Sequence, residues 1–192
     1  MARLRDTRNQ IIDKAADLLM KHGYNGFSYR DISTHLGVKN AAVHYHFPSK
    51  SDLGLALVSE YRQILRDQTS EFMAYGGAAL PQIEGLFRFT EQQFCNGRCI
   101  CPFGAFAVDF SDLPEPVRDA TEKFMSDSVN WLTRVLETGR EQDEFRFAGD
   151  ARAKALSILA GLSGARQMAR IHGQDVLSQI IGQVRVELNL DS

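Results

Sequence analysis

The stretch SYRDISTHLGVKNAAVHYHFPSKSDL, residues 28–53, decides the fold. Ser28 and Asp31 stand at the spacing of a helix N-cap and its partner, so a short helix is expected to begin there. Gly37 then supplies a tight turn, and a second short helix follows it as far as Phe47. Two short helices joined by a sharp turn are typical of a helix-turn-helix, in which the second helix crosses the first.

The crossing of the two helices requires a small residue on the first helix, and Ser33 provides one. Apolar side chains around it would fill the core that the two helices share: Ile32, Leu36, Val38 and Val43. These requirements constrain several positions at once, so the pattern indicates a helix-turn-helix independently of any relative.

The rest of the chain also follows helical periodicity. Thr7 and Gln10 stand at capping-box spacing before a first helix that should end at Gly23, and Ser49 and Asp52 open a longer helix. Further helices are expected over 83–94, from 102 to about 110, from the stretch SDLPEPV (111–117) through 135, and approximately over 150–172 and 174–190. No segment shows sustained alternation of apolar and polar residues, so the chain is predicted to be all-α with about nine helices.

The composition is that of a globular protein with one or two compact domains, since 44% of the 192 residues are hydrophobic and 24% are charged. A signal peptide is not expected, because Arg3, Arg5, Asp6 and Arg8 occupy the place of its apolar region. No apolar run reaches the ~20 residues that cross a bilayer. The sequence therefore predicts a soluble, cytoplasmic protein with no membrane partner, whose cysteines are reduced at rest.

Charge is distributed unevenly along the chain. Residues 1–50 hold eight lysines and arginines against four aspartates, a net charge of +4, whereas the whole chain carries −2. Four of the five histidines also lie in this first part. A basic first quarter on an acidic body favours a local nucleic-acid surface, although chance unevenness over a short window explains the charge equally well.

Three stretches of the N-terminal part resemble the tetracycline-repressor (TetR) family of bacterial transcriptional regulators: AADLLMKHGYNGFSYRDIS, LGV and HYHFPSKSDL. In that family a glycine-aromatic step, here Gly26-Phe27, precedes a run such as Tyr45-His46-Phe47 and a following Lys-x-x-Leu, here Lys50 to Leu53. The resemblance is strong over residues 5–65. Beyond them it depends on the number and length of the helices.

The resemblance implies that the helix over residues 40–47 enters the major groove of an operator. Asn40 can make two hydrogen bonds to adenine, and Lys39 at the helix cap can reach a guanine edge or a phosphate. Relatives often have Ser or Thr in place of Lys39 and an aromatic in place of His44. The expected DNA contacts are Ser28, Lys39, Asn40, Ala41, His44, Tyr45, His46 and Lys50, of which Ser28, His46 and Lys50 match positions that mostly contact phosphates. The alternative for Tyr45 is packing inside the small domain, and for Phe47 packing is the preferred interpretation.

The resemblance also implies a domain organisation. Residues 1–50 would form the DNA-binding domain, a helix over about 49–70 would bridge the domains, and residues 66–192 would bind an effector and dimerise. An apolar effector pocket is expected to be lined by some of Phe87, Phe94, Cys99, Phe103, Phe106, Phe124 and Trp131, although any single aromatic could belong to an ordinary core.

The last two helices, over about 150–190, are predicted to form a homodimer. The run ALSILAGLSGARQMA is rich in small residues that let helix backbones approach, and Val176, Ile180, Val184 and Leu188 form one apolar stripe. The buried core of a monomer would give the same stripe, and the resemblance to the family favours the dimer. A twofold dimer implies a near-palindromic operator. Repression that a small molecule relieves is the mode that the resemblance favours, and activation is the alternative.

All three cysteines lie in the segment FCNGRCICPFGAF, residues 94–106. Their C-x3-C-x-C spacing lacks the second ligand pair of a structural zinc site, so no metal and no cofactor are expected. Cys99 or Cys101 could instead be a redox or electrophile sensor, because Arg98 and a helix beginning at Pro102 would favour the thiolate. A cysteine-dependent enzyme is the distant alternative, since no nucleophile motif is present, and the protein is predicted not to be an enzyme. The remaining interpretation is that the thiols line the effector pocket.

Overall fold

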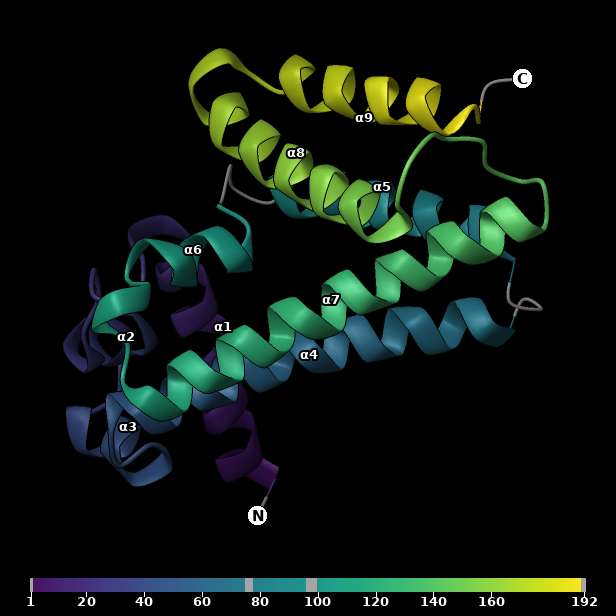
Figure 1. Cartoon of the computed structure of the whole chain (residues 1–192). Coiled ribbons are helices and arrows are strands. Elements are labelled where there is room, and N and C mark those ends of the chain that lie inside the picture. The colour runs from purple at the N-terminus through teal and green to yellow at the C-terminus, as the bar shows by residue number, and fades with distance from the viewer. Residues whose placement is uncertain (1, 75–77, 96–99, 191–192) are drawn as a thin grey trace. The chain divides into compact units, whose positions relative to one another are not determined.

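The structure is a computed structural model that describes residues 2–74, 78–95 and 100–190, with the side chains of all of these except 2–6, 68–74, 95 and 103. Within this described part the chain is all helical and contains no strand, as the sequence predicts (Figure 1). The elements are α1 (Ala2–His22), α2 (Tyr29–Leu36), α3 (Asn40–His46), α4 (Lys50–Ala74), α5 (Ala79–Cys95), α6 (Pro102–Val108), the 3-10 helix η1 (Phe110–Asp112), α7 (Glu115–Glu141), α8 (Ala151–His172) and α9 (Asp175–Leu188).

The chain forms two compact units. Unit 1 comprises residues 1–63 and 101–124, and unit 2 comprises residues 64–100 and 125–192. The first three helices therefore share a unit with α6, η1 and the first part of α7, and α4 and α7 each have residues in both units. The functional division of the chain at about residues 50 and 66 stays a prediction.

The predicted start and turn of the helix-turn-helix are both confirmed. The backbone N–H and the hydroxyl of Ser28 both donate to Oδ2 of Asp31, and each donor–acceptor distance is 2.7 Å. The Ser28 hydroxyl is the main reason why the pKa of Asp31 lies below its usual value. At the other end, Gly37 adopts the left-handed conformation with φ of 65°, and the N–H of Val38 bonds back to the carbonyl oxygen of Ser33 (3.0 Å). α2 is thus closed at both ends by its own sequence.

The first helix departs from the prediction at its N-terminus. The capping spacing of Thr7 and Gln10 does not open it, because α1 already begins at Ala2. Residues 2–6, Ala-Arg-Leu-Arg-Asp, contain several strong helix formers, so the helix continues upstream of the capping pattern. Its end at His22, before Gly23 with φ of 79°, is as predicted.

The core of unit 1 joins the helix-turn-helix to α1 and α4. Ile32 and Val43 of the motif are fully buried, as predicted, and Ser33 at the crossing is buried as well. Leu36 and Val38 are only half-buried. Further large side chains of this core come from α1 and α4 (Ile11, Ile12, Leu19, Leu53, Leu57 and Val58) and from α6 and α7 (Phe106, Val117 and Phe124).

Unit 2 has a separate apolar core built from α5, α7, α8 and α9. Its fully buried members include Phe87 of α5, Leu132 of α7, Ile158 of α8 and Leu177 of α9. The carboxylate of Glu144 accepts hydrogen bonds from the first two N–H groups of α5, at Ala79 and Leu80, and so caps that helix from a distant loop.

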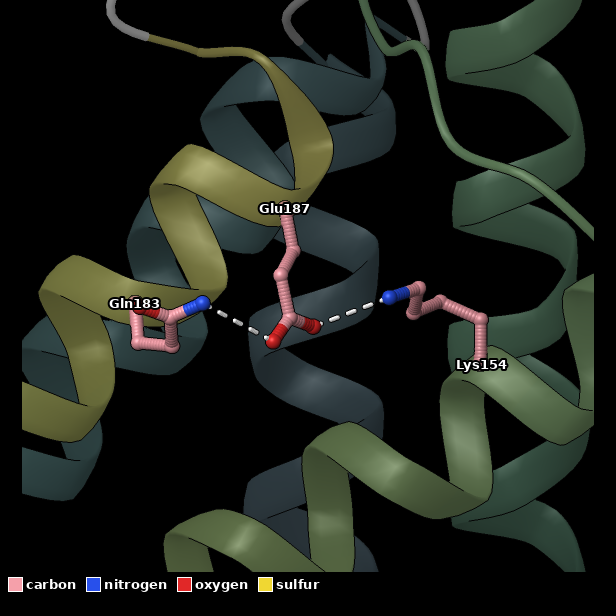
Figure 2. A network of polar contacts seen from close by, with 3 residues as sticks. All are labelled: Lys154, Gln183 and Glu187. Atoms are coloured by element: carbon pink, nitrogen blue, oxygen red, sulfur yellow. Dashed lines mark hydrogen bonds and ion pairs between the residues drawn. The ribbon is translucent and has the colours of Figure 1, made fainter.

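α8 and α9 form a helical hairpin, and a polar network joins their outer sides (Figure 2). Oε2 of Glu187 on α9 pairs with Nζ of Lys154 on α8 (2.9 Å), while Nε2 of Gln183 donates to Oε1 (3.2 Å). The Lys154 bond lowers the pKa of Glu187. The network therefore stabilises the hairpin fully at pH values above the ordinary pKa of a glutamate. This stabilisation is lost as the pH falls through the lower pKa that Glu187 has in the folded protein. Because the pair is partly exposed, its contribution is small, ~0.2–1 kcal/mol.

We predict that Gly37→Ala lowers the free energy of unfolding by about 1–2 kcal/mol, because a residue with a Cβ is strained at φ of 65°. A Cβ at this position meets no atom within 4 Å, so the cost is conformational and not steric. Gly37→Asn is the matched control and should lose clearly less, since asparagine tolerates the left-handed region. Urea unfolding of the three proteins measures the difference, and equal stability of the alanine variant and the wild type would contradict the prediction.

Candidate nucleic-acid interface

The second helix of the motif, α3, presents most of its side chains to solvent. Lys39 at its cap, Asn40, Ala41 and His44 are exposed, and 73% of Tyr45 is exposed, whereas His46 is half-buried. Tyr45 therefore does not pack in the core of unit 1. Its ring and hydroxyl are therefore available for contact with another molecule.

The polar side chains on this surface make few contacts inside the described protein. Within the part of the chain that the structure describes, the side chains of Lys39 and Asn40 make no hydrogen bond or ion pair. The imidazole of His46 lies edge-on to the Tyr45 ring, with 5.2 Å between the centroids, and that of His44 meets the Tyr29 ring at 4.7 Å. Donors and acceptors of α3 are thus available to a partner without breaking an internal bond.

The inner side of α3 is held firmly. Val43 is fully buried and Phe47, at the end of the helix, is 2% exposed, which confirms that Phe47 packs in the core. The hydroxyl of Tyr29 donates to the carbonyl oxygens of Phe47 (2.9 Å) and Ser49, so it ties α2 to the link between α3 and α4. Burial raises the pKa of Tyr29 to about 12, which keeps this hydroxyl a donor at every physiological pH.

Two of the predicted phosphate contacts make internal bonds instead of pointing freely into solvent. The Ser28 hydroxyl is exposed but donates to Asp31. The ammonium of Lys50 donates to the carbonyl oxygen of Phe27 and lies over the rings of Tyr24 (5.0 Å) and Phe27 (4.5 Å). Burial is the main cause that lowers the pKa of Lys50, and the negative charges of Asp109 and Asp31 act in the opposite direction.

Sequence reasoning did not find the part that Asp109 has in this unit. Oδ2 of Asp109, directly after α6, accepts a hydrogen bond from the backbone N–H of Asn25 in the turn between α1 and α2 (2.9 Å). A Cβ on Gly23 would lie 2.8 Å from the same oxygen, so the turn needs glycine there for space as well as for its φ. Asn25 and Asp109 are 84 positions apart, and no local pattern signals a contact of that range.

The predicted effector-pocket residues fall into two groups. Phe87, Phe94 and Trp131 are buried together in the core of unit 2, where Nε1 of Trp131 donates to Oε1 of Gln82 (3.3 Å). Two others belong to unit 1: Phe106, whose ring centroid lies 6.3 Å from that of Tyr24, and Phe124, at the same distance from Tyr61. Cys99 and the side chain of Phe103 lie outside the described residues. That these aromatics line a pocket stays a prediction.

Of the three cysteines, the structure describes the side chain of Cys101 alone. It is 6% exposed, and its Sγ accepts a hydrogen bond from the N–H of Gly104 (3.3 Å), so it caps α6 directly before Pro102, the predicted first helical residue. A buried thiol is less accessible to oxidants than a sensor requires. Cys95 and Cys99, the latter also a sensor candidate, lie outside the described side chains.

Among the residues that the structure describes, no three histidine, cysteine or acidic side chains gather closely enough to hold a metal ion. None of the described helices is both long enough and apolar enough to cross a membrane.

Comparison with known proteins supports the same assignment for both parts of the chain. Residues 11–57 match the family of bacterial regulatory proteins named tetR, and residues 82–182 match the tetracyclin repressor-like C-terminal domain. A TetR-family regulator from Agrobacterium tumefaciens has 33% identity and a TM-score of 0.89, with 96% of this chain and 98% of that one covered. A TetR regulator from Legionella pneumophila has 29% identity and a TM-score of 0.82, over 93% and 95%.

Among curated proteins, the HTH-type transcriptional repressor NemR of Escherichia coli K12 is 25% identical over 169 residues, which are 86% of this chain and 85% of that protein. Two family models thus match separate parts of the chain, and together with a relative of 33% identity over nearly its whole length they establish the family. The exposed second helix of the motif is the element that such regulators direct at DNA. The chain belongs to the TetR family of bacterial DNA-binding transcriptional regulators.

Proposed function

We propose that this regulator is a repressor that binds a near-palindromic operator as a homodimer and is released by a small-molecule effector. The observation that carries the DNA-binding part is the two-sided character of α3. Its polar outer side chains have no bonds inside the described protein, while its inner side is fixed by Val43, Phe47 and the Tyr29 hydroxyl. A rigidly held helix with unused donors and acceptors is suited to reading base edges.

The outer side chains of α3 divide by the contacts they can make. Asn40 can bond to adenine with two hydrogen bonds, and Tyr45 can reach a base or the backbone with its hydroxyl. Ala41 permits close approach or contact with a thymine methyl. Lys39, His44 and His46 can donate to phosphates, which fixes the register on the duplex without reading its sequence.

Repression is supported by the relative from Escherichia coli, whose name is that of a transcriptional repressor. Small-molecule release is supported by membership of a family in which it is the commonest mode. We propose the surroundings of Phe87, Phe94 and Trp131 in unit 2 as the effector region, because the three aromatics share one apolar cluster and Trp131 bonds to a polar group, Gln82, that could orient a ligand. The protein then acts by binding and not as an enzyme, and it works in the cytoplasm, where its operator lies.

Dimerisation through α8 and α9 is supported by apolar side chains on the exposed side of this hairpin. Four large ones are exposed there: Leu156, Met168, Ile171 and Val186. Ile171 is 81% exposed, which is costly for a surface that faces only water. Gly161 and Gly164 lie on α8. A Cβ at Gly164 would meet nothing within 4 Å, so the backbone of a partner helix could approach closely there.

Selection of bound fragments from random or genomic DNA by the purified protein tests the proposal. We expect one enriched sequence with near-twofold symmetry, whose half-sites are centred about one or more helical turns of ~10 bp apart. If no sequence is enriched over nonspecific DNA, operator binding is contradicted. A single asymmetric site bound by one copy would contradict the dimer.

We predict that Tyr45→Ala and Phe47→Ala act on different properties. Tyr45 is exposed, so its loss should change the free energy of unfolding by no more than ~0.5 kcal/mol while it lowers the ratio of specific to nonspecific DNA affinity. Phe47 is buried, and its loss should cost about 3–5 kcal/mol of stability. Asn40→Ala should behave as Tyr45→Ala does. Chemical unfolding and titrations with operator and nonspecific DNA measure both effects, and an equal loss of affinity for both DNAs would argue against base reading.

We predict that Ile171→Glu dissociates the dimer, because two added charges would be buried in the interface. Val108→Glu is the matched control: Val108 is 71% exposed but lies on α6 in unit 1, so its variant should remain dimeric. Sedimentation equilibrium gives the mass of each protein. A dimeric Ile171→Glu protein would place the interface elsewhere.

A further inference from the structure

Lys50 is the residue whose position in unit 1 differs most from the role that the sequence suggests. It is the first residue of α4 and was expected to contact a phosphate, yet its ammonium is directed into the protein. Nζ donates to the carbonyl oxygen of Phe27 and lies 4.5 and 5.0 Å from the ring centroids of Phe27 and Tyr24. The ammonium thus already has a carbonyl oxygen and two ring faces as partners before DNA arrives.

Lys50 contacts the turn between α1 and α2. Phe27 is its last residue, directly before the N-cap Ser28 of α2. Tyr24 lies in the same turn, and its hydroxyl donates back to the carbonyl oxygen of Lys50 (2.9 Å). Lys50 and the turn thus exchange two hydrogen bonds, one in each direction.

Asp109 fixes the same turn from another side. Its carboxylate accepts the N–H of Asn25, two positions before Phe27. A Cβ on Gly54, one helical turn after Lys50, would lie 2.9 Å from the Tyr24 ring, so α4 and the turn are packed in direct contact. The turn is therefore enclosed by an ammonium from α4, a carboxylate from the end of α6 and the backbone of α4.

The orientation of α3 depends on this arrangement. α2 begins at the end of the enclosed turn, and the Tyr29 hydroxyl, in the first residue of α2, holds the carbonyl groups of Phe47 and Ser49 at the exit of α3. The chain of contacts runs from Lys50 through Phe27 and Tyr29 to the end of the recognition helix. Loss of the Lys50 contact would remove one of the links that hold α2 and α3 in place.

We propose that Lys50 is a positioning residue, which sets the angle of the recognition helix by holding the turn between α1 and α2 together with Asp109, and does not neutralise a DNA phosphate. The proposal rests on the proposed binding of an operator through α3. It concerns how that surface is held, and it assigns to the side chain at the start of α4 a role different from that of the phosphate-contacting residues Lys39 and His46.

The salt dependence of operator affinity distinguishes the two roles, because each phosphate that a lysine neutralises adds ~0.9 to the slope of log affinity against log salt. Lys50→Met keeps the carbon stem between the two rings and removes the ammonium. We expect operator affinity to fall about tenfold, which corresponds to the loss of one charge-assisted hydrogen bond, and we expect the salt slope to stay unchanged. Lys39→Ala is the matched control and should lower the slope by ~1 for each copy of the chain on the DNA.

Lys50→Arg keeps the charge and provides a second comparison should the methionine variant be unfolded at the assay temperature. The guanidinium is larger and planar, whereas the compact ammonium lies 4.5 and 5.0 Å from two ring centroids, so we expect arginine to displace the turn and lower the affinity although the charge remains. A phosphate contact would keep its affinity with arginine. A lower slope for Lys50→Met, or full affinity for Lys50→Arg, would overturn the proposal.

Asp109→Asn tests the shared function through a double-mutant cycle on operator affinity. Since both side chains hold one turn, the losses of Lys50→Met and Asp109→Asn should be clearly less than additive when combined. Hydrogen exchange of the N–H groups of residues 24–27 should quicken in both variants and stay unchanged in Lys39→Ala. Additive losses would mean that the two residues act separately. Absence of operator binding by the wild type would instead contradict the proposed function, which keeps the two failures apart.

Discussion

The Tyr29 hydroxyl, which donates to the carbonyl oxygens of Phe47 and Ser49, is the constraint on which the exposed surface of α3 depends. A helix of seven residues has almost no stability by itself, so α3 exists and keeps its direction only through tertiary contacts. Val43 and Phe47 supply apolar burial, which is strong but permits sliding. The hydroxyl adds direction, because hydrogen bonds require a defined geometry. Arg8 of α1 closes the arrangement with its guanidinium 5.1 Å from the centroid of the Phe47 ring.

Local patterns in the sequence predicted the parts of this fold that are themselves local. The caps of α2 and α4 depend on a serine and an aspartate three positions apart, and both form as expected. The turn at Gly37 and the stop at Gly23 follow from the left-handed backbone that glycine permits. The predicted start of α1 at Thr7 was wrong. A capping spacing competes with the helix propensity of the residues before it, and here the propensity prevails.

Contacts between distant positions were beyond a single sequence. Nothing near Lys50 indicates that its ammonium turns toward Phe27, since an exposed phosphate contact and an internal hydrogen bond need the same residue type. Asp109 stands in an unremarkable part of the chain, and its bond to Asn25 appears only once α6 is placed beside α1. The positions of the aromatic residues after α4 could not be predicted from a single sequence either. Phe87 and Phe106 fit the same apolar pattern, yet they belong to the cores of different units.

The separation of α3 into a held side and an unused side has an evolutionary consequence. Substitutions of Asn40, Ala41 or Tyr45 remove no contact with the core of the described protein, so they meet little selection from folding. A duplicated gene could therefore drift toward a new operator by changing these few positions while its fold stays intact. The residues beneath, Tyr29 and Phe47 above all, would resist change in every descendant, because they serve whichever operator is read.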